Sequence, residues 1–376
     1  MKKILLFSRD PGGANTVIPL VGALNGRGYE VRLFGKDIAL ERYSMAGLEG
    51  KDIIGFVKNI NQDAIEDLLL SENPDFIITG TSACDFTEKY LWKASEKLNI
   101  PSFAILDQWI NYGIRFSRYS TAEIGEYEKD KSLPYLPSRI LVMDEYAREE
   151  AIKDGLDPSK ILVSGQPYFE TLLKEKEKAS SEMLKELRSR LGIGSDDLII
   201  TFASEPVSKD YKNDYWGFNE KTIFEQLFEG VKEVSKRSGK KISMIIKVHP
   251  REDEGCFEGI ASETEKLKII IDRDSKPMYL ILISDIVAGM SSMFLIEAAI
   301  IGKPVLSLLM GMNNKRESPF VLDRKGIVKS IKGRKELINR LDAIIASGGK
   351  ENAGFDFIRN PVINIISYME KYLCQN

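Results

Sequence analysis

The sequence predicts an α/β protein with two successive domains, each built on a parallel sheet. Short apolar runs with the length of strands alternate with stretches of helical periodicity. The alternation stops at Gly165-Gln166-Pro167 and starts again near residue 198. A chain of 376 residues is long for one domain, because single cores stop growing near roughly 250–300 residues. Two domains of βαβ units therefore fit the sequence best.

The pattern in the first half of the sequence predicts one parallel sheet. Its strands are expected at residues 3–7, 30–34, 76–79, 102–106, 139–142 and 161–164. Helices are expected between them, among others at residues 16–26, 62–71 and 86–98. A Gly-rich turn at residues 10–15 joins the first strand to the first helix. Strands that alternate with helices in this way pair in parallel.

The second half repeats the pattern after a long, charged helical stretch at residues 170–191, the expected connection between the domains. Strands are expected at residues 198–203, 242–248, 267–271, 285–288 and 304–309. Helices are expected at residues 221–237 and 292–301, and again from residue 334 to the end, with breaks around residues 347–354 and Pro361. We predict domains at residues 1–166 and 167–360, with the active site in the cleft between them.

The composition excludes several kinds of chemistry. His249 is the single histidine, so no His-rich zinc site, HExxH motif or Ser-His-Asp site with a spare imidazole can form. Three widely spaced cysteines argue for a reducing compartment. The net charge of −3 gives no general attraction for nucleic acid, and no nucleic-acid partner is expected. Without an apolar run of ~18 residues, we expect a cytoplasmic protein, at most peripheral to the inner face of a membrane.

His249 is the first candidate for ligand binding. An apolar run carries it to the end of a predicted strand, and Pro250 ends the strand there. This edge of an open α/β sheet faces the ligand, so the imidazole can donate to a phosphate, with charge added by Lys247 or Arg251. A loop histidine bonded to a neighbouring carbonyl group is an equal alternative.

The second candidate begins where another predicted strand ends, at Gly289. Ser291 and Ser292 open an apolar helix, whose N-terminus offers hydroxyls, backbone N–H groups and a favourable dipole to an anion. Glu297 follows in the same helix, where its carboxylate can reach a ribose diol. Burial inside an apolar helix requires that this carboxylate be satisfied or ligand-bound. Simple N-capping by the serines is the alternative.

These segments share the order of a known fold: strand-His-Pro, strand-Gly-x-Ser-Ser, a helix with Glu-Ala-Ala, then Gly302-Lys303-Pro304-Val305. Over residues 198–310 this order resembles the C-terminal domain of GT-B glycosyltransferases, with the UDP-N-acetylglucosamine 2-epimerases and CDP-glycerol transferases as relatives. The resemblance implies two Rossmann-like domains that face a cleft, with a last helix at residues 361–376 that crosses back to the first domain. The His-Pro and Ser-Ser pair is similar to the motifs that hold CMP in bacterial sialyltransferases, polysialyltransferases and Kdo transferases.

On this resemblance, His249, Ser291 and Ser292 bind the donor phosphate. The implied activity is an inverting, metal-independent transfer of a sugar from a nucleotide sugar, with a CMP-nonulosonate or Kdo-like donor favoured. The acceptor would be a glycan, lipid or protein in cell-surface glycoconjugate synthesis, and no cofactor besides the donor substrate is expected. UDP-sugar transfer, a UDP-GlcNAc 2-epimerase-like reaction and CDP-glycerol-type transfer are alternatives, as is a binding protein that has lost its base.

Two further turns are expected near the nucleotide. Ser204 and Glu205 directly follow the first strand of the second half, where such folds usually contact it. Gly12 and Gly13, after the first strand of the chain, allow the backbone to approach a ligand. An ordinary capped or tight turn is an equal alternative in both places.

Asp107 is the predicted general base, because it follows a strand and has Trp109 beside it to stack on a sugar. Asp10 is the second choice. The Asp/Glu-Asp/Glu-Gly motif that holds the base of CMP-sialic acid transferases is absent, and Asp107 as a simple cap is the alternative. The segment 272–274 matches the metal-binding DxD pattern, but we expect a solvated loop there and no bound metal.

Overall fold

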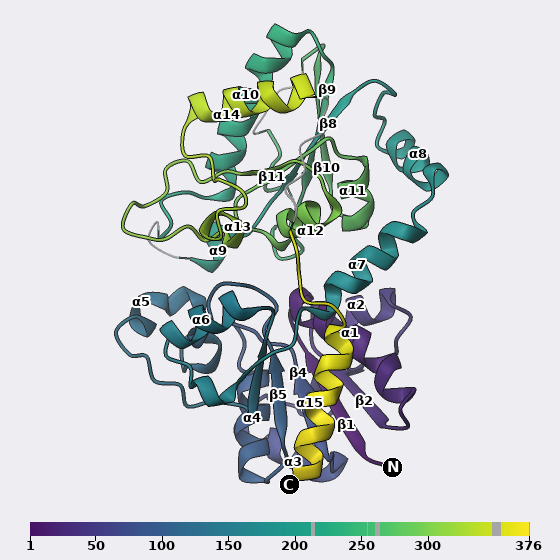
Figure 1. Ribbon diagram of the computed structural model, residues 1–376, viewed down its shortest axis with the longest axis vertical. Helices are drawn as coiled ribbons and strands as arrows, with labels where there is room; N and C mark the ends of the chain where they lie inside the picture. The colour runs from purple at the N-terminus through teal and green to yellow at the C-terminus, as the bar shows by residue number, and fades with distance from the viewer. Residues whose placement is uncertain (212–214, 254, 260–263, 348–354, 376) are drawn as a thin grey trace. The chain divides into compact units, whose positions relative to one another are not determined.

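The computed structural model describes residues 1–211, 215–253, 255–259, 264–347 and 355–375. It divides into two compact units, each of which holds one sheet (Figure 1). Unit 1 comprises Met1–Thr171 and Phe357–Asn376, and unit 2 comprises Leu172–Asp356. Every strand pair in both sheets is parallel, so the predicted class of two parallel α/β domains is confirmed. None of the helices in the described ranges is long and apolar enough to cross a membrane.

The sheet of unit 1 has seven strands in the order β3-β2-β1-β4-β5-β6-β7. They are β1 (Lys3–Ser8), β2 (Glu30–Gly35), β3 (Lys51–Asp52), β4 (Phe76–Thr79), β5 (Ser102–Ile105), β6 (Arg139–Val142) and β7 (Ile161–Val163). The chain first builds outward from β1 to β3 and then returns to β4 on the other side of β1. This reversal makes the carboxyl ends of β1 and β4 the topological switch point, where ligands of such sheets bind.

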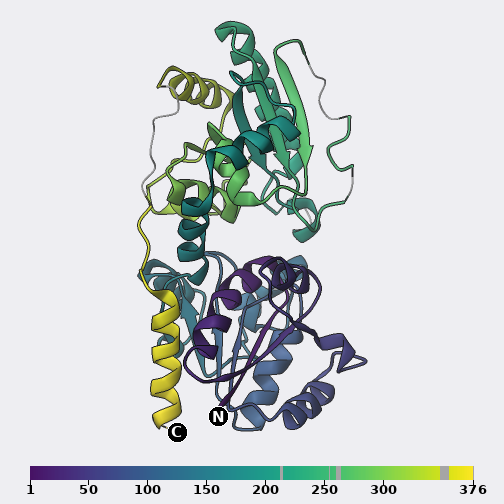
Figure 2. The same ribbon diagram turned by 90° about the vertical axis from the view of Figure 1, so that its right-hand side faces the viewer.

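Helices cover both faces of this sheet. One face carries α1 (Pro11–Asn25), α2 (Ile38–Met45) and the C-terminal α15 (Pro361–Gln375), which Figure 2 shows as the yellow helix; the other carries α3 (Gln62–Glu72) and α4 (Thr87–Lys97). Side chains alternate along each strand, so Ile4 and Leu6 face the first group while Leu5 and Phe7 face the second. The remaining short elements of the unit are α5 (Ile124–Tyr127), α6 (Glu145–Lys153), η1 (Ile53–Gly55), η2 (Gly113–Phe116), η3 (Thr121–Glu123) and η4 (Pro158–Lys160).

Unit 2 has a sheet of five strands in the order β10-β9-β8-β11-β12. They are β8 (Leu198–Ala203), β9 (Ile242–Lys247), β10 (Leu267–Asp272), β11 (Ile286–Gly289) and β12 (Val305–Ser307). Its helices are α8 (Ser181–Arg190), α9 (Val207–Asp210), α10 (Glu220–Ser238), α11 (Pro277–Ile283), α12 (Met293–Ile301), α13 (Val321–Arg324) and α14 (Arg334–Ser347). The chain again reverses beside the first strand, so the switch point lies at the carboxyl ends of β8 and β11.

The expected turn at residues 10–15 is wrong, because α1 begins at Pro11. Asp10 is the N-cap residue and Pro11 takes the first helical position, where a missing N–H costs nothing. Glycine is required here for packing. A Cβ atom on Gly80 would lie 2.6 Å from Cα of Gly13, so the start of α1 can approach the end of β4 only without side chains.

The single long helix expected at residues 170–191 is also wrong. The structure has α7 (Pro167–Lys178) followed by α8, with a break at Ala179 and Ser180. The Ser180 hydroxyl accepts a hydrogen bond from the Met183 backbone N–H at 3.3 Å, which starts a new helix. Charged residues follow a helical pattern on both sides of Ala179 and Ser180. The periodicity of the sequence therefore did not reveal the break between α7 and α8.

Candidate functional site

The switch point of unit 2 brings together three segments that the sequence singled out. Ser204 and Glu205 follow β8, Ser291 and Ser292 follow β11, and His249 follows β9. Strands β9, β8 and β11 are neighbours in the sheet, so their carboxyl ends form one continuous edge. Segments more than 80 residues apart in the chain thereby become a single candidate site.

The N-terminus of α12 already binds a carboxyl group of the protein itself. The Glu205 carboxylate accepts from the backbone N–H groups of Ser291 and Ser292 at 2.6 and 2.8 Å. It also accepts from the Ser291 hydroxyl at 2.8 Å. The Ser292 hydroxyl instead caps the helix by accepting from the Phe294 N–H at 3.2 Å. In this structure a carboxylate of the chain itself takes these donors, and binding of a ligand anion by Ser291 and Ser292 stays a prediction.

Two opposing effects set the charge state of Glu205. Burial raises its pKa above the ordinary value, while the hydrogen bonds from Ser291 and Ser292 favour the ionised form and offset part of the increase. The helix dipole acts in the same direction as these bonds. Glu205 is thus held by neutral donors, and burial is the larger of the two effects on its pKa.

Gly289 and Glu297 shape the same region from within unit 2. A Cβ atom on Gly289 would lie 2.8 Å from the Ala203 carbonyl oxygen and 2.7 Å from Leu295, so glycine permits β11 and α12 to pack against β8. Glu297 is only 6% exposed on α12. The contact of Glu297 with a ribose diol stays a prediction. The role of Gly289 that the structure shows is to allow close packing of β11.

His249 lies in a tight turn that Glu252 closes. The Glu252 carboxylate accepts from the His249 backbone N–H at 2.7 Å, and the Glu252 N–H donates to the His249 carbonyl at 2.9 Å. The His249 Nδ1 atom accepts from the Arg251 N–H at 3.1 Å. This pattern assigns the proton of the neutral ring to Nε2, which can donate to an oxygen of a ligand. The alternative of a histidine that only bonds a carbonyl stays open.

Glu252 was missed by the sequence reasoning. Its second carboxylate oxygen accepts from the Ser204 hydroxyl at 2.6 Å, so it ties the loop after β8 to the His249 turn. Burial raises the pKa of Glu252, and the bonds from Ser204 and His249 oppose this. The sequence did contain a sign of this contact: Glu252 lies three residues after His249, which is the spacing of a capping box.

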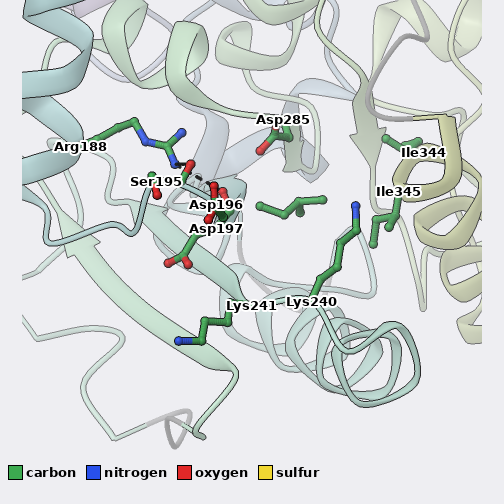
Figure 3. Close-up of a pocket in the computed structure, with 10 residues that line it drawn as sticks. Arg188, Ser195, Asp196, Asp197, Lys240, Lys241, Asp285, Ile344 and Ile345 are labelled. Carbon is green, nitrogen blue, oxygen red and sulfur yellow. Dashed lines mark hydrogen bonds between the residues drawn. The ribbon is translucent and has the colours of Figure 1, made fainter.

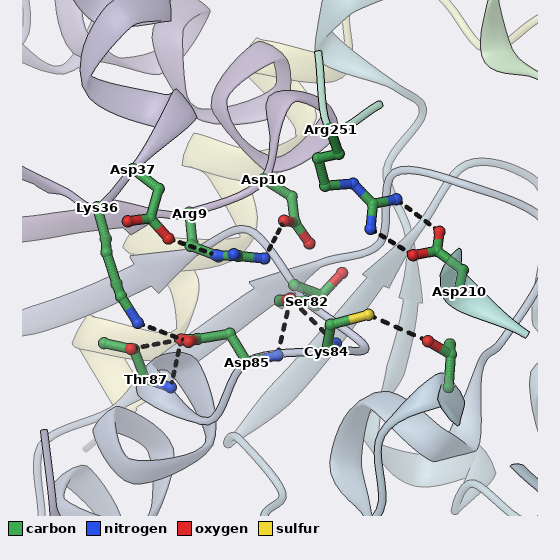
Figure 4. A network of polar contacts seen from close by, with 12 residues as sticks. Arg9, Asp10, Lys36, Asp37, Ser82, Cys84, Asp85, Thr87, Asp210 and Arg251 are labelled. Carbon is green, nitrogen blue, oxygen red and sulfur yellow. Dashed lines mark hydrogen bonds and ion pairs between the residues drawn. The ribbon is translucent and has the colours of Figure 1, made fainter. Parts of the chain in front are cut away.

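The charges expected beside His249 are engaged elsewhere. Lys247 Nζ forms an ion pair with Asp272 at 3.3 Å and donates to the carbonyl groups of Arg273 and Ser275. Arg251 forms a bidentate pair with Asp210 at 2.5 and 2.6 Å (Figure 4). Lys247 and Arg251 therefore both form ion pairs within the protein.

The expectation of a solvated loop at residues 272–274 is wrong for Asp272. This residue is 5% exposed and accepts from the Ser275 hydroxyl at 2.5 Å, in addition to its pair with Lys247. Sequence could not show this, because Lys247 comes from the neighbouring strand β9. Among the residues that the structure describes, no group of three or more His, Cys, Asp or Glu could hold a metal ion.

In unit 1, Asp107 lies beyond the end of β5 and is buried, with 4% of its surface exposed. It forms an ion pair with Arg115 at 2.8 Å, and Arg115 also donates to the Thr81 hydroxyl at 2.6 Å. Burial raises the pKa of Asp107, and Arg115 opposes this increase. A Cβ atom on Gly12 would lie 1.7 Å from its other carboxylate oxygen. Gly12 therefore makes room for Asp107, and an approach of this backbone to a ligand stays a prediction.

Asp10 is the more accessible of the two predicted bases. Its side chain is 25% exposed and pairs with Arg9 at 2.9 Å, and Arg9 also contacts Asp37 at 2.9 Å (Figure 4). Lys36 pairs with Asp85 at 2.6 Å on the same edge of the sheet. Burial opposes ionisation of Asp85, but the bonds from Lys36 and Thr87 prevail and lower its pKa.

The expectation that Trp109 could stack on a sugar is wrong. The ring is 3% exposed and stacks on Phe169 with 6.0 Å between the ring centroids. Its indole N–H donates to the Asp144 carboxylate at 3.0 Å. The segment 165–167, where the predicted alternation stops, supports Asp107, because the Gln166 amide donates to the Asp107 carbonyl at 3.2 Å.

Glu88 is a second carboxylate that sequence reasoning missed. It lies in the first turn of α4 and is 1% exposed. Neither carboxylate oxygen has a hydrogen-bond partner within the described parts of the chain. Burial, with smaller contributions from Asp85 and Asp10, raises its pKa to about 8. Its position after Asp85 in a charged helix start gave no sign of burial.

A pocket of about 510 Å³ lies at the opposite, amino edge of the unit 2 sheet (Figure 3). Leu198 at the start of β8, Lys241 before β9 and Asp285 before β11 line it. Arg188 on its wall donates to the Ser195 carbonyl at 3.0 Å. Because ligands of open parallel sheets bind at the carboxyl edge, this pocket is not the candidate site.

A comparison with protein families decides the identity of the chain. The model of the CDP-glycerol:poly(glycerophosphate) glycerophosphotransferases matches residues 152–359, which is more than half of the sequence and includes all of unit 2. The chain belongs to this family. The CMP-sugar transferases suggested by the His-Pro and Ser-Ser motifs receive no support from the match. A search of curated proteins finds no match to this glycerophosphotransferase family member.

Solved structures similar to this glycerophosphotransferase family member confirm the GT-B-like fold. UDP-GlcNAc 2-epimerase from Neisseria meningitidis, bound to UDP-GlcNAc, matches with a TM-score of 0.68 and 16% identity over 100% of both chains. MnaA of S. aureus, solved with UDP, matches with a TM-score of 0.70 and 15% identity over 99% of this chain and 97% of that one. UDP-GlcNAc 2-epimerase from Methanocaldococcus jannaschii matches with a TM-score of 0.64 and 16% identity over 98% and 99%. At these identities the likeness establishes the fold alone.

Proposed function

We propose that this chain is a transferase that uses a cytidine-nucleotide donor and binds the donor's phosphates at the carboxyl edge of unit 2. One observation carries the proposal: the N-terminus of α12 and the His249 turn lie on the same carboxyl edge of the sheet, inside the segment that matches the glycerophosphotransferase family. The groups there are hydrogen-bond donors, namely backbone N–H groups, the Ser291 hydroxyl and Nε2 of His249. Donors of this kind at a helix N-terminus suit phosphate.

The proposed reaction is glycerophosphate transfer from a CDP-linked donor. An acceptor hydroxyl attacks the phosphorus that carries the glycerol, the bond from this phosphorus to the CMP phosphate oxygen breaks, and CMP leaves. A base takes the hydroxyl proton. Negative charge develops on the leaving CMP, where His249 and the α12 N-terminus would stabilise it.

Transfer of a CMP-linked nonulosonate or Kdo-like sugar is the second candidate. The His-Pro and Ser-Ser motifs favour it, and it also ends with CMP as the leaving group. The same phosphate site would serve both reactions. Glycerophosphate transfer ranks first because the family match supports it.

The base is proposed to be an aspartate of unit 1. Asp10 is supported by its 25% exposed side chain, whereas Asp107 is buried against Arg115. Asp10→Asn and Asp107→Asn keep the side-chain size and remove the charge. The expected result is loss of CMP release in one variant, and a melting curve of each variant separates this from the loss of stability that Asp107→Asn should cause by removing the counter-charge of Arg115. Full activity in both would contradict an aspartate base at these positions.

The test is CMP release by the purified chain with CDP-glycerol, a CMP-linked nonulosonate or UDP-GlcNAc as donor and a glycerophosphate oligomer as acceptor. CDP-glycerol is expected to give CMP in an acceptor-dependent reaction. Thermal-shift measurements with CMP, CDP, UDP and GDP provide the binding comparison, with CDP and CMP expected to stabilise most. A response to UDP alone, with turnover of UDP-GlcNAc in the absence of acceptor, would contradict the proposal and favour an epimerase.

A further inference from the structure

We propose that Glu205 is a displaceable occupant of the phosphate position. Its carboxylate holds the N-terminus of α12 in the free protein and leaves when a donor phosphate binds. This inference rests on the proposed function and adds a residue that controls access to that site. It concerns contacts within unit 2 only.

The first step is that Glu205 uses the donors a phosphate needs. Its two carboxylate oxygens accept from the N–H of Ser291, the N–H of Ser292 and the hydroxyl of Ser291, all within 2.6–2.8 Å. Each N–H points in one direction and can serve one strong acceptor at a time. A phosphate at the start of α12 and the Glu205 carboxylate therefore exclude each other.

The second step concerns charge. The hydrogen bonds to the Glu205 carboxylate come from backbone N–H groups and a hydroxyl, and together with the helix dipole they stabilise one anion. A phosphate beside a retained carboxylate would place two anions within hydrogen-bond reach of each other. Like charges at this distance repel, so exchange is favoured over joint occupancy.

The third step is that Glu205 can leave, whereas its neighbour cannot. The Glu205 carboxylate is held by hydrogen bonds from Ser291 and Ser292, and both residues belong to the site where the phosphate would bind. The side chain has three rotatable bonds and starts from the loop after β8. Glu252 differs, because it connects the Ser204 hydroxyl to the His249 N–H and would have to open the His249 turn to move.

Exchange gives the site two properties. The donors at α12 stay satisfied in the free protein, which avoids the cost of leaving buried N–H groups without a partner. Return of the carboxylate after the reaction would compete with bound CMP and assist its release. Neutral ligands gain nothing from the site, because they cannot replace the carboxylate.

The experiment measures CDP affinity by isothermal titration calorimetry in the full chain. Glu205→Gln keeps the size of the side chain and removes its charge, and we expect CDP to bind about tenfold tighter. Glu225→Gln is the matched control, because Glu225 is exposed on α10 and its loss should leave CDP affinity unchanged. Glu205→Asp is the second variant: its shorter side chain reaches the donors poorly, so CDP should again bind more tightly.

Inorganic pyrophosphate serves as a second probe and should gain affinity in Glu205→Gln by a similar factor. In Ser291→Ala, which removes one shared donor, the gain from Glu205→Gln should shrink. If CDP binds the wild-type chain and binds Glu205→Gln equally or more weakly, Glu205 is a permanent part of the site and the inference is wrong. If CDP binds none of the variants, the proposed function fails and the inference fails with it.

Discussion

The two sheets have the same switch-point topology, but they stabilise charge at their carboxyl edges in different ways. In unit 1 the carboxylates pair with cations: Asp107 with Arg115, Asp10 with Arg9 and Asp85 with Lys36. Unit 2 also has ion pairs at this edge, Lys247 with Asp272 and Arg251 with Asp210, but the hydrogen bonds to Glu205 and Glu252 come from backbone N–H groups and hydroxyls. An internal ion pair satisfies both of its charges, whereas the neutral donors around Glu205 are the groups that the proposed exchange with a phosphate requires.

The largest expected effect is loss of stability when the buried pair of unit 1 is broken. Asp107→Ala leaves Arg115 buried without its counter-charge, and we expect the free energy of unfolding to fall by about 3–5 kcal/mol. Urea denaturation measures this. The double variant with Arg115→Met should recover much of the loss. A change below about 1 kcal/mol in Asp107→Ala would show that the pair does not hold this edge together.

At the edge of unit 2 the expected effect is on activity. His249→Ala removes the proposed donor to the phosphate of the leaving CMP and should lower CMP release by about 100-fold. Because His249 lies in a surface turn and is only half-buried, the melting temperature should stay close to that of the wild type. Activity within threefold of the wild type would remove His249 from the phosphate site.

The buried Glu88 carboxyl group of unit 1 predicts that the stability of the protein depends on pH. Its folded pKa of about 8 lies above the ordinary 4.5, so the folded state binds the extra proton between these values. The free energy of unfolding should therefore fall as the pH rises from about 4.5 to about 8, by up to about 1.4 kcal/mol per pH unit, and level off above this range. Urea denaturation from pH 5 to pH 9 checks this. Glu88→Gln keeps the buried shape and should lose this slope, and parallel curves for the two proteins would contradict a protonated Glu88.

The smallest expected effect concerns Glu252, which connects Ser204 to the His249 turn. Glu252→Gln keeps one acceptor and should cost about 1 kcal/mol of stability. A more specific consequence is weaker CDP binding, since the His249 turn loses its clamp. Unchanged CDP affinity at reduced stability would limit Glu252 to a structural role.

Sequence patterns were sufficient for the fold apart from the short edge strand β3, whose two residues Lys51 and Asp52 are charged, because the other strands are apolar runs whose ends coincide with Gly, Pro or charged residues. They also placed Ser291 and His249 at strand ends. The contact of Glu205 with Ser291 was not predictable, because it joins residues 86 positions apart through a strand order that the local pattern does not contain. The contacts of Trp109 with Phe169 and of Asp272 with Lys247 were not predictable for the same reason. Burial of a polar or aromatic residue at a strand end depends on its neighbours in space.

Hydrogen–deuterium exchange of the full chain with and without CDP tests the phosphate site most directly. The predicted result is slower exchange in peptides that contain Ser291–Ser292 and His249, at the carboxyl edge of unit 2. Peptides around Lys241 and Asp285, at the pocket on the amino edge, should stay unchanged. Protection confined to that amino edge, with none at α12, would contradict the account.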